Sequence, residues 1–215
     1  LARRHGFAAS FMAKPYEDYA GSGLHTHFSV IDDDGNNVFD NGEQDGTDMM
    51  RHAVAGCLEA MAGSALIFAP HANSFDRMVP GSHAPTGISW AYENRTSSIR
   101  IPSGATSARR IEHRVSGGDV NPYLMLAAVL GAAINGIEDG KDPVAPITGN
   151  AYAADLPQIP NTWEAAIDAF EKDPAVARIF APELIQNLVL TKRQELVEMK
   201  ELSRAEQVEI YLDTV

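Results

Sequence analysis

The sequence predicts an α+β fold in which short strands lie ahead of most of the helices. Three observations lead to this class. Runs of β-prone residues separated by Gly-rich turns occupy residues 6–40 and return between 88 and 115, apolar residues at helical spacing occupy 48–68, and helical patterns dominate after residue 121. We therefore expect a sheet of antiparallel strands packed against helices.

The first 40 residues predict strands. The β-prone runs are Phe7–Met12, Leu24–Ile31 and Asn37–Phe39. Asp33-Asp34-Gly35-Asn36 lies between the last two runs, and these residue types favour the backbone angles of a hairpin turn.

One amphipathic helix is predicted next. Thr47 and Asp48 provide its amino-terminal cap, and Pro70 ends it. The apolar residues that follow helical spacing are Met50, Val54, Cys57, Leu58, Met61 and Phe68. Cys57 lies on the inner face, so we expect a small core residue there rather than a nucleophile.

Three more strands and a buried helix are predicted over residues 88–137. The strands are Ile88–Tyr92, Ser98–Ile101 and Arg110–Val115. Asn121-Pro122 begins a helix, because the Asn side chain can cap it and Pro fits its first position. This helix runs to Ile137 and is apolar on nearly every side, so it is expected to be buried.

The last third of the chain predicts a connection and two helices. Residues 140–160 contain four prolines and predict an extended surface connection. Asn161-Thr162-Trp163-Glu164 has the form of a capping box that opens a helix to Lys172. A longer helix is predicted over 182–203, with Ile185, Leu188, Val189, Leu196 and Met199 facing inward.

The composition excludes several function classes. The 215 residues include 17 Lys+Arg and 29 Asp+Glu, a net charge of −12, which disfavours nucleic acid or an anionic membrane as the main partner. The single cysteine excludes an internal disulfide and multi-cysteine zinc sites, and it suits a cytoplasmic protein. The longest run without strongly polar side chains, Tyr123–Ala133, is far shorter than the ~20 residues of a membrane span.

Polar side chains gather on one face of the run at 24–31. The period of two in a strand places His25, His27 and Ser29 together. Such a row is either a half-exposed strand with solvated histidines or a metal or phosphate site. Gly21 and Gly23 would let the backbone approach a ligand closely, but the chain contains no P-loop and no dinucleotide-binding motif.

The strand at 110–115 also alternates, placing Arg110, Glu112 and Arg114 on one face. This row is either a surface ion-pair row or part of a binding site. Residues 76–114 carry six arginines, three acidic residues and no lysine, a local charge of +3 that suits bidentate binding of carboxylate or phosphate. If His25 and Glu112 face each other, they supply two ligands for a hard divalent cation that could bridge nucleotide phosphates.

These motifs resemble the carboxy-terminal half of the glutamine synthetase catalytic domain. They occur in the same order and at the same spacing as in that family, and the resemblance covers nearly the whole chain. The segments that carry the resemblance are Lys14-Pro15, Gly21-Ser22-Gly23-Leu24-His25-Thr26-His27-Phe28-Ser29, Asn73-Ser74, Arg77-Met78-Val79-Pro80-Gly81, Asn94-Arg95-Thr96, Ile99-Arg100-Ile101-Pro102, Ala108-Arg109-Arg110-Ile111-Glu112 with Arg114, and Asn121-Pro122-Tyr123. The resemblance implies that residues 1–215 are the carboxy-terminal portion of this domain. An amino-terminal domain and the first part of the catalytic domain would precede them, as the start at Leu1 instead of Met also suggests.

The resemblance also implies roles for individual residues. His25 and Glu112 would bind Mg²⁺ or Mn²⁺, and His27, Ser29, Arg100 and Arg110 would lie near ATP. Gly21, Arg77 and Arg114 would bind glutamate. Arg95 and Arg100 would neutralise the phosphoryl group during transfer, and His83 would take the catalytic position in a flap after Pro80-Gly81.

The implied protein is a cytoplasmic ATP-dependent ligase that activates glutamate as γ-glutamyl phosphate and joins it to an amine. Family members form homo-oligomeric rings with sites between subunits, so we expect the 215 residues alone to be inactive, with exposed strand edges.

Two departures from the family pattern concern the amine. Ala20 replaces an Asn of ammonia-using members, and His83 replaces their flap glutamate. An imidazole cannot offer ammonium the same negative charge, so the sequence favours the branch that ligates glutamate to polyamines such as putrescine. The alternatives are an ordinary glutamine synthetase, a metal-dependent hydrolase of the His-x-His type, and a non-catalytic binding or regulatory relative.

Overall fold

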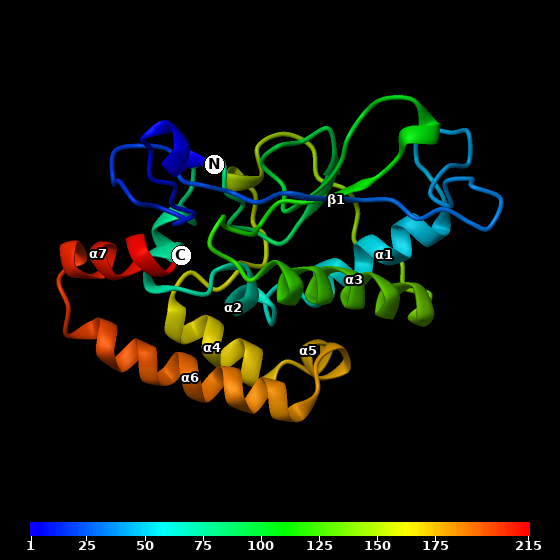
Figure 1. The fold of residues 1–215 in the computed structure, drawn as a ribbon. Helices are drawn as coiled ribbons and strands as arrows, with labels where there is room; N and C mark the ends of the chain where they lie inside the picture. Colours follow the sequence, from blue (N-terminus) through cyan, green and yellow to red (C-terminus); the bar gives the residue numbers. More distant parts are fainter.

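The computed structural model describes the backbone of residues 1–215 and every side chain except that of Asp213. The elements form three layers, with the sheet on one side, α1, α2 and α3 beneath it, and α4, α5 and α6 beneath those helices (Figure 1). The α+β class is therefore confirmed. No helix in the described part of the chain is both long and apolar enough to cross a membrane.

The sheet contains four short strands, β1 (Thr26–Phe28), β2 (Trp90–Tyr92), β3 (Ile99–Ile101) and β4 (Ile111–His113), in the order β1-β4-β3-β2. β4 pairs antiparallel with both β1 and β3, as predicted. β2 and β3 pair in parallel instead, so the sheet is mixed.

The strand prediction for the first 40 residues is only partly correct. Phe7–Met12 contains no strand, because Phe7 and Phe11 are exposed and no described strand runs beside them. Only Thr26–Phe28 of the second run pairs in the sheet. The turn at 33–36 is present, since Ile31 and Asn37 form an antiparallel bridge across it.

The single helix predicted from Asp48 to Pro70 is wrong, because the chain forms two helices there. α1 (Asp48–Glu59) begins as expected, with the Thr47 side chain accepting a hydrogen bond from the Met50 amide. The chain then turns at 60–64 before α2 (Ala65–Phe68). Gly63 lies in this turn, where a Cβ atom would come within 2.5 Å of Asp173, so the turn packs tightly against the third layer.

α3 (Pro122–Asp139) begins at its predicted Asn121 cap and ends at Gly140, which is left-handed with φ 61°. One face packs against α1 through two glycines. A Cβ on Gly136 would lie 2.1 Å from the His52 carbonyl oxygen, and one on Gly56 would lie 2.0 Å from that of Ala132. The opposite face is exposed, so the prediction of burial on every side is wrong for Tyr123, Leu126, Leu130 and Ile134.

The carboxy-terminal helices are α4 (Trp163–Lys172), α5 (Pro174–Ile179), α6 (Pro182–Lys200) and α7 (Arg204–Thr214). α4 and α6 agree with the predicted helices, whereas α5 and α7 were not predicted. Thr162 caps α4 by accepting a hydrogen bond from the Ala165 amide, so its N3 residue is Ala165 and no capping box with Glu164 forms.

The connection at 140–160 is not purely a surface segment, because it packs along the β2 edge of the sheet. The Ile147 amide donates to the Trp90 carbonyl at 2.9 Å, and Gln158 bridges to Gly87. Ile159 is buried in the core.

The crossing of α1 and α3 gives a test of the packing. Gly136→Ala places a methyl group against backbone that cannot move aside, so we expect the 215-residue chain to unfold about 4–10 °C lower in a thermal scan followed by circular dichroism. Gly131→Ala in the same helix is the matched control, because the atoms nearest to its Cβ belong to the Ile179 side chain, at 2.8 Å, and a side chain can move aside more easily than backbone, so a smaller decrease is expected. Equal unfolding temperatures for the two variants would contradict the packing account.

Candidate functional site

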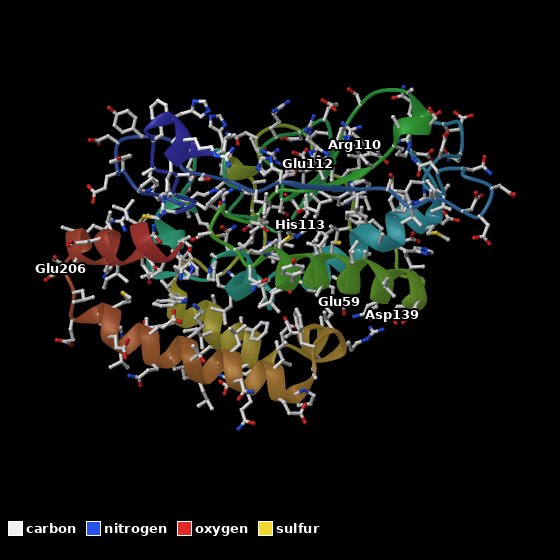
Figure 2. All side chains as sticks on the ribbon, viewed as in Figure 1. Glu59, Arg110, Glu112, His113, Asp139 and Glu206 are labelled. Carbon is white, nitrogen blue, oxygen red and sulfur yellow. The ribbon has the colours of Figure 1, made fainter. Side chains whose placement is uncertain are left out.

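Glu112 is the centre of a polar cluster on the sheet. The strand register places it directly between His27 of β1 and Arg100 of β3. Because paired residues point to the same face, these three side chains meet above the sheet. Figure 2 shows Glu112 and Arg110 on the side away from the helices and His113 on the helix side. His113 is buried against Phe68, with 4.6 Å between the ring centroids.

Two imidazoles meet the same carboxylate oxygen. His25 Nδ1 lies 3.2 Å from Glu112 Oε1, and His27 Nε2 lies 3.6 Å from that oxygen. The sequence predicted that His25 and Glu112 would face each other, and the structure brings them together. Both rings are partly exposed, with 33% and 40% of their side-chain surface accessible, so the cluster is open to ligands on this side.

Two guanidinium groups hold Glu112 from within the protein. Arg114 Nη1 donates to Oε1 at 2.8 Å, and Arg100 Nη1 donates to Oε2. All three side chains are buried. Buried ionised groups are tolerated when each is paired and hydrogen-bonded, which is the arrangement here. The row of Arg110, Glu112 and Arg114 predicted from the sequence is therefore not a surface ion-pair row.

Other guanidinium donors bind the surrounding chain, whereas the buried Nε atoms of Arg100 and Arg114 have no hydrogen-bond partner among the described residues. Arg100 Nη2 also donates to Glu93 at 3.2 Å, and Arg114 Nη2 donates to the Arg95 carbonyl at 2.9 Å. Arg110 Nε donates to His27 Nδ1 at 3.2 Å. His27 Nδ1 is thus an acceptor, so its proton is on Nε2 and points toward Glu112.

The Glu112 carboxyl stays ionised at neutral pH. Burial raises its pKa, but the hydrogen bonds from His25 and Arg100 and the charges of Arg114 and Arg100 outweigh burial and bring the pKa to about 2. Burial lowers the pKa of His27, and the charges of Arg110 and Arg100 lower it further against the opposing effect of Glu112. The cluster therefore combines a fixed carboxylate, a neutral imidazole and an excess of guanidinium charge.

This donor set suits part of a divalent-cation site. An ionised carboxylate and an imidazole are both metal ligands, and they face the open side of the sheet. In the described part of the chain no group of three or more His, Cys, Asp and Glu side chains is arranged to hold a metal ion. His25 and Glu112 can therefore supply two ligands, and further ligands would have to come from outside these residues.

Arg77 lies apart from the Glu112 cluster, beneath the glycine segment. Its Nη1 donates to the Val115 carbonyl at 2.7 Å, and its side chain is buried. A Cβ on Gly21 would lie 3.0 Å from Arg77 Cγ, and one on Gly23 would lie 2.8 Å from Nη2. The glycines thus make room for the guanidinium.

Besides Gly21 and Arg77, three further predicted site residues lie outside the cluster. The Arg95 side chain is exposed, and only its carbonyl contacts Arg114. His83 is exposed in the segment after Pro80-Gly81, with a left-handed φ of 64°. Ser29 lines a separate hollow with Asn36, Asn37 and Ser107.

Two contacts beside the cluster were not predicted. Glu93 binds Arg100, and the Tyr152 hydroxyl donates to the Ala84 carbonyl at 2.9 Å. Glu93 stands isolated between two strands, and Tyr152 lies in a connection with no regular pattern. Neither position carries a periodic signal that could have identified it.

Comparison with known proteins places this site in a family. The family described as "Glutamine synthetase, catalytic domain" matches residues 1–211. Similar proteins include a gamma-glutamylethanolamide synthetase of Streptomyces coelicolor, 38% identical over 91% of this chain and 42% of the relative, and a gamma-glutamylputrescine synthetase of Escherichia coli, 32% identical over 97% and 44%. The chain spans less than half the length of these relatives.

A solved structure supports the same relationship. The GmaS/ADP complex superposes with a TM-score of 0.84 and 30% identity over 98% of this chain and 50% of that one. The resemblance seen in the sequence motifs is thus confirmed by both the family match and the fold. The chain belongs to the glutamine synthetase family.

Proposed function

We propose that this chain is the carboxy-terminal portion of an ATP-dependent ligase that joins the γ-carboxylate of glutamate to an amine. One observation carries the proposal. Glu112 meets His25 on the open face of the sheet, and Arg100, Arg110 and Arg114 lie beside it. An excess of guanidinium groups around a possible cation site suits a reaction between two anions, the γ-phosphate of ATP and a carboxylate.

The proposed reaction has two steps. A γ-carboxylate oxygen of glutamate attacks the γ-phosphorus, the bond from that phosphorus to the β–γ bridging oxygen breaks, and ADP leaves. The amine nitrogen then attacks the acyl carbon of γ-glutamyl phosphate, the carbon–oxygen bond to phosphate breaks, and the nitrogen loses a proton. The products are the amide, ADP and phosphate.

The side chains would divide this work by charge. His25 and Glu112 would bind Mg²⁺ or Mn²⁺, which when bound supplies positive charge at the phosphate oxygens. His27, Ser29, Arg100 and Arg110 would lie along ATP, and Arg95 and Arg100 would stabilise the charge of the transferring phosphoryl group. Gly21, Arg77 and Arg114 would bind glutamate, and His83 would lie over the amine.

The parts of the site that these residues do not provide would come from the rest of the polypeptide and from neighbouring subunits. The chain covers less than half of its relatives, and among its described residues no group of three or more His, Cys, Asp and Glu side chains is arranged to hold a metal ion. A homo-oligomeric ring with shared sites would complete the ligand set, and the isolated 215 residues would be inactive.

The amine we propose is an organic amine, with polyamines such as putrescine as the first candidates. His83 stands in the flap and Ala20 precedes the glycine segment, so neither position offers a fixed negative charge to ammonium. The relatives named for ethanolamide and putrescine products support this choice.

Removing the negative charge of Glu112 tests the site. In the full-length enzyme, Glu112→Gln should lower the rate of ADP formation with glutamate and amine on the order of 100-fold or more, because the amide cannot replace the carboxylate toward a cation. Glu93→Gln is the matched control, since Glu93 also binds Arg100 but is about half exposed and lies away from His25. A loss of similar size in both variants would contradict the assignment.

His25→Ala tests the same cation site without leaving buried arginines unpaired, so it keeps the protein folded. We expect the Mn²⁺ concentration needed for half-maximal activity to rise about 10-fold or more, with an unfolding temperature near that of the wild type. An unchanged Mn²⁺ requirement would exclude His25 as a ligand.

A panel of amines tests the substrate class. We expect kcat/KM with putrescine, spermidine or ethanolamine to exceed that with ammonium by at least about 10-fold, because no flap carboxylate is present to attract the small cation. His83→Glu should raise ammonium use, and His83→Gln, which adds no charge, should not. A preference of the wild type for ammonium would identify an ordinary glutamine synthetase instead.

A further inference from the structure

The segment after Pro80 makes a tight turn that exposes His83. Gly81 has φ 84° and His83 has φ 64°, so two of three consecutive residues are left-handed. The left-handed region costs energy for a residue with a side chain, and such a conformation persists only when the surrounding contacts hold it. The position of His83 therefore depends on the contacts of residues 80–85, which we call the flap.

Two side chains hold the flap, one on each side of His83. The Ser82 hydroxyl is 2.7 Å from the Arg77 carbonyl and 2.6 Å from the Val79 carbonyl, so it ties the turn to its own base. The Tyr152 hydroxyl donates to the Ala84 carbonyl at 2.9 Å, and Ala84 is buried. Among the hydrogen bonds of the described residues, only that of Tyr152 reaches the flap from a distant part of the chain.

Tyr152 is itself held in place by the strand region. It lies in a short 3-10 helix (Ala151–Ala153) whose Ala151 amide donates to Thr96 Oγ1 at 2.9 Å. Asn94 Nδ2 donates to the Gly149 carbonyl at 2.6 Å. The residues that contact this segment thus flank Arg95, so Tyr152 connects the flap to the arginine-rich side of the site.

The phenol is suited to act as a donor at neutral pH. Burial raises the pKa of Tyr152, although the nearby charges of Arg114 and Arg77 lower it in part. The hydroxyl therefore keeps its proton. These charges belong to the two arginines proposed to bind glutamate.

We propose that Tyr152 is a positioning residue that holds the flap so that His83 lies over the amine, and that it thereby determines how well the amine binds. The inference rests on the proposed function. Tyr152 lies outside the polar cluster, and it would influence the selection of the amine through one hydrogen bond to the flap backbone.

Tyr152→Phe in the full-length enzyme removes this hydrogen bond and keeps the ring. We expect KM for putrescine, or for the best amine of the panel, to rise about 3- to 10-fold, with KM for ATP within twofold of the wild type, since a lost neutral hydrogen bond has an effect of this size. Tyr92→Phe is the matched control, because the Tyr92 hydroxyl also donates to a backbone carbonyl, that of Asp45, at 3.0 Å. It should leave KM for the amine unchanged.

A double variant separates positioning from general stability. If Tyr152 acts through His83, Tyr152→Phe should have little further effect on KM for the amine in a His83→Ala background. A full additional effect in that background, an unchanged KM in the single variant, or an equal rise in Tyr92→Phe would overturn the inference while the proposed function stands. A wild-type enzyme that forms no γ-glutamyl amide with any amine or with ammonium would overturn both.

Discussion

The structure of the site depends on one buried carboxylate. Glu112 is in contact with two guanidinium groups and two imidazoles, and each partner comes from a different position in the chain. A carboxylate so deeply buried is stable only when its charge is matched, so the pairing of β1, β4 and β3 and the arginines are required together. Strand register, ionisation state and ligand-binding geometry are consequently set by the same contacts. A shift of the register by one residue would turn Glu112 toward the apolar helices and His113 toward the ligand face.

The charge of the site is opposite to that of the whole chain. The protein carries a net charge of −12, yet the region from Asp76 to Arg114 has an excess of three positive charges. Acidic residues elsewhere are paired on the helical surface, as with Asp139 and Arg178 or Asp168 and Arg193. The proposed anionic substrates would be attracted to this region, and the acidic remainder of the chain would repel them. This separation supports the proposed pair of anionic substrates.

Much of this arrangement could be predicted from the sequence where a physical rule links spacing to direction. The period of two in strands predicted one polar row at His25, His27 and Ser29 and another at Arg110, Glu112 and Arg114, and the caps at Thr47 and Asn121 predicted where α1 and α3 begin. Spacing along the sequence could not predict the features that depend on contacts between distant segments. The turn that separates α1 from α2 depends on contact between Gly63 and Asp173, over a hundred residues away. Both faces of α3 are apolar, although the buried one carries mostly small residues, so hydrophobicity alone could not distinguish them. The Tyr152 contact with Ala84 joins two irregular segments, for which no periodicity exists.

The fit of Gly21 and Gly23 over Arg77 has a consequence for how variants of this protein would be interpreted. A Cβ on Gly23 would meet the Arg77 guanidinium at 2.8 Å, and one on Gly21 would meet the Ala13 carbonyl oxygen at 2.7 Å and Arg77 Cγ at 3.0 Å. A mutational survey that scores enzyme activity would therefore rank both positions among the least tolerant and suggest that they touch the substrate. At Gly23 the intolerance would come instead from the space that the Arg77 guanidinium occupies, and at Gly21 this steric limit would add to the proposed binding of glutamate.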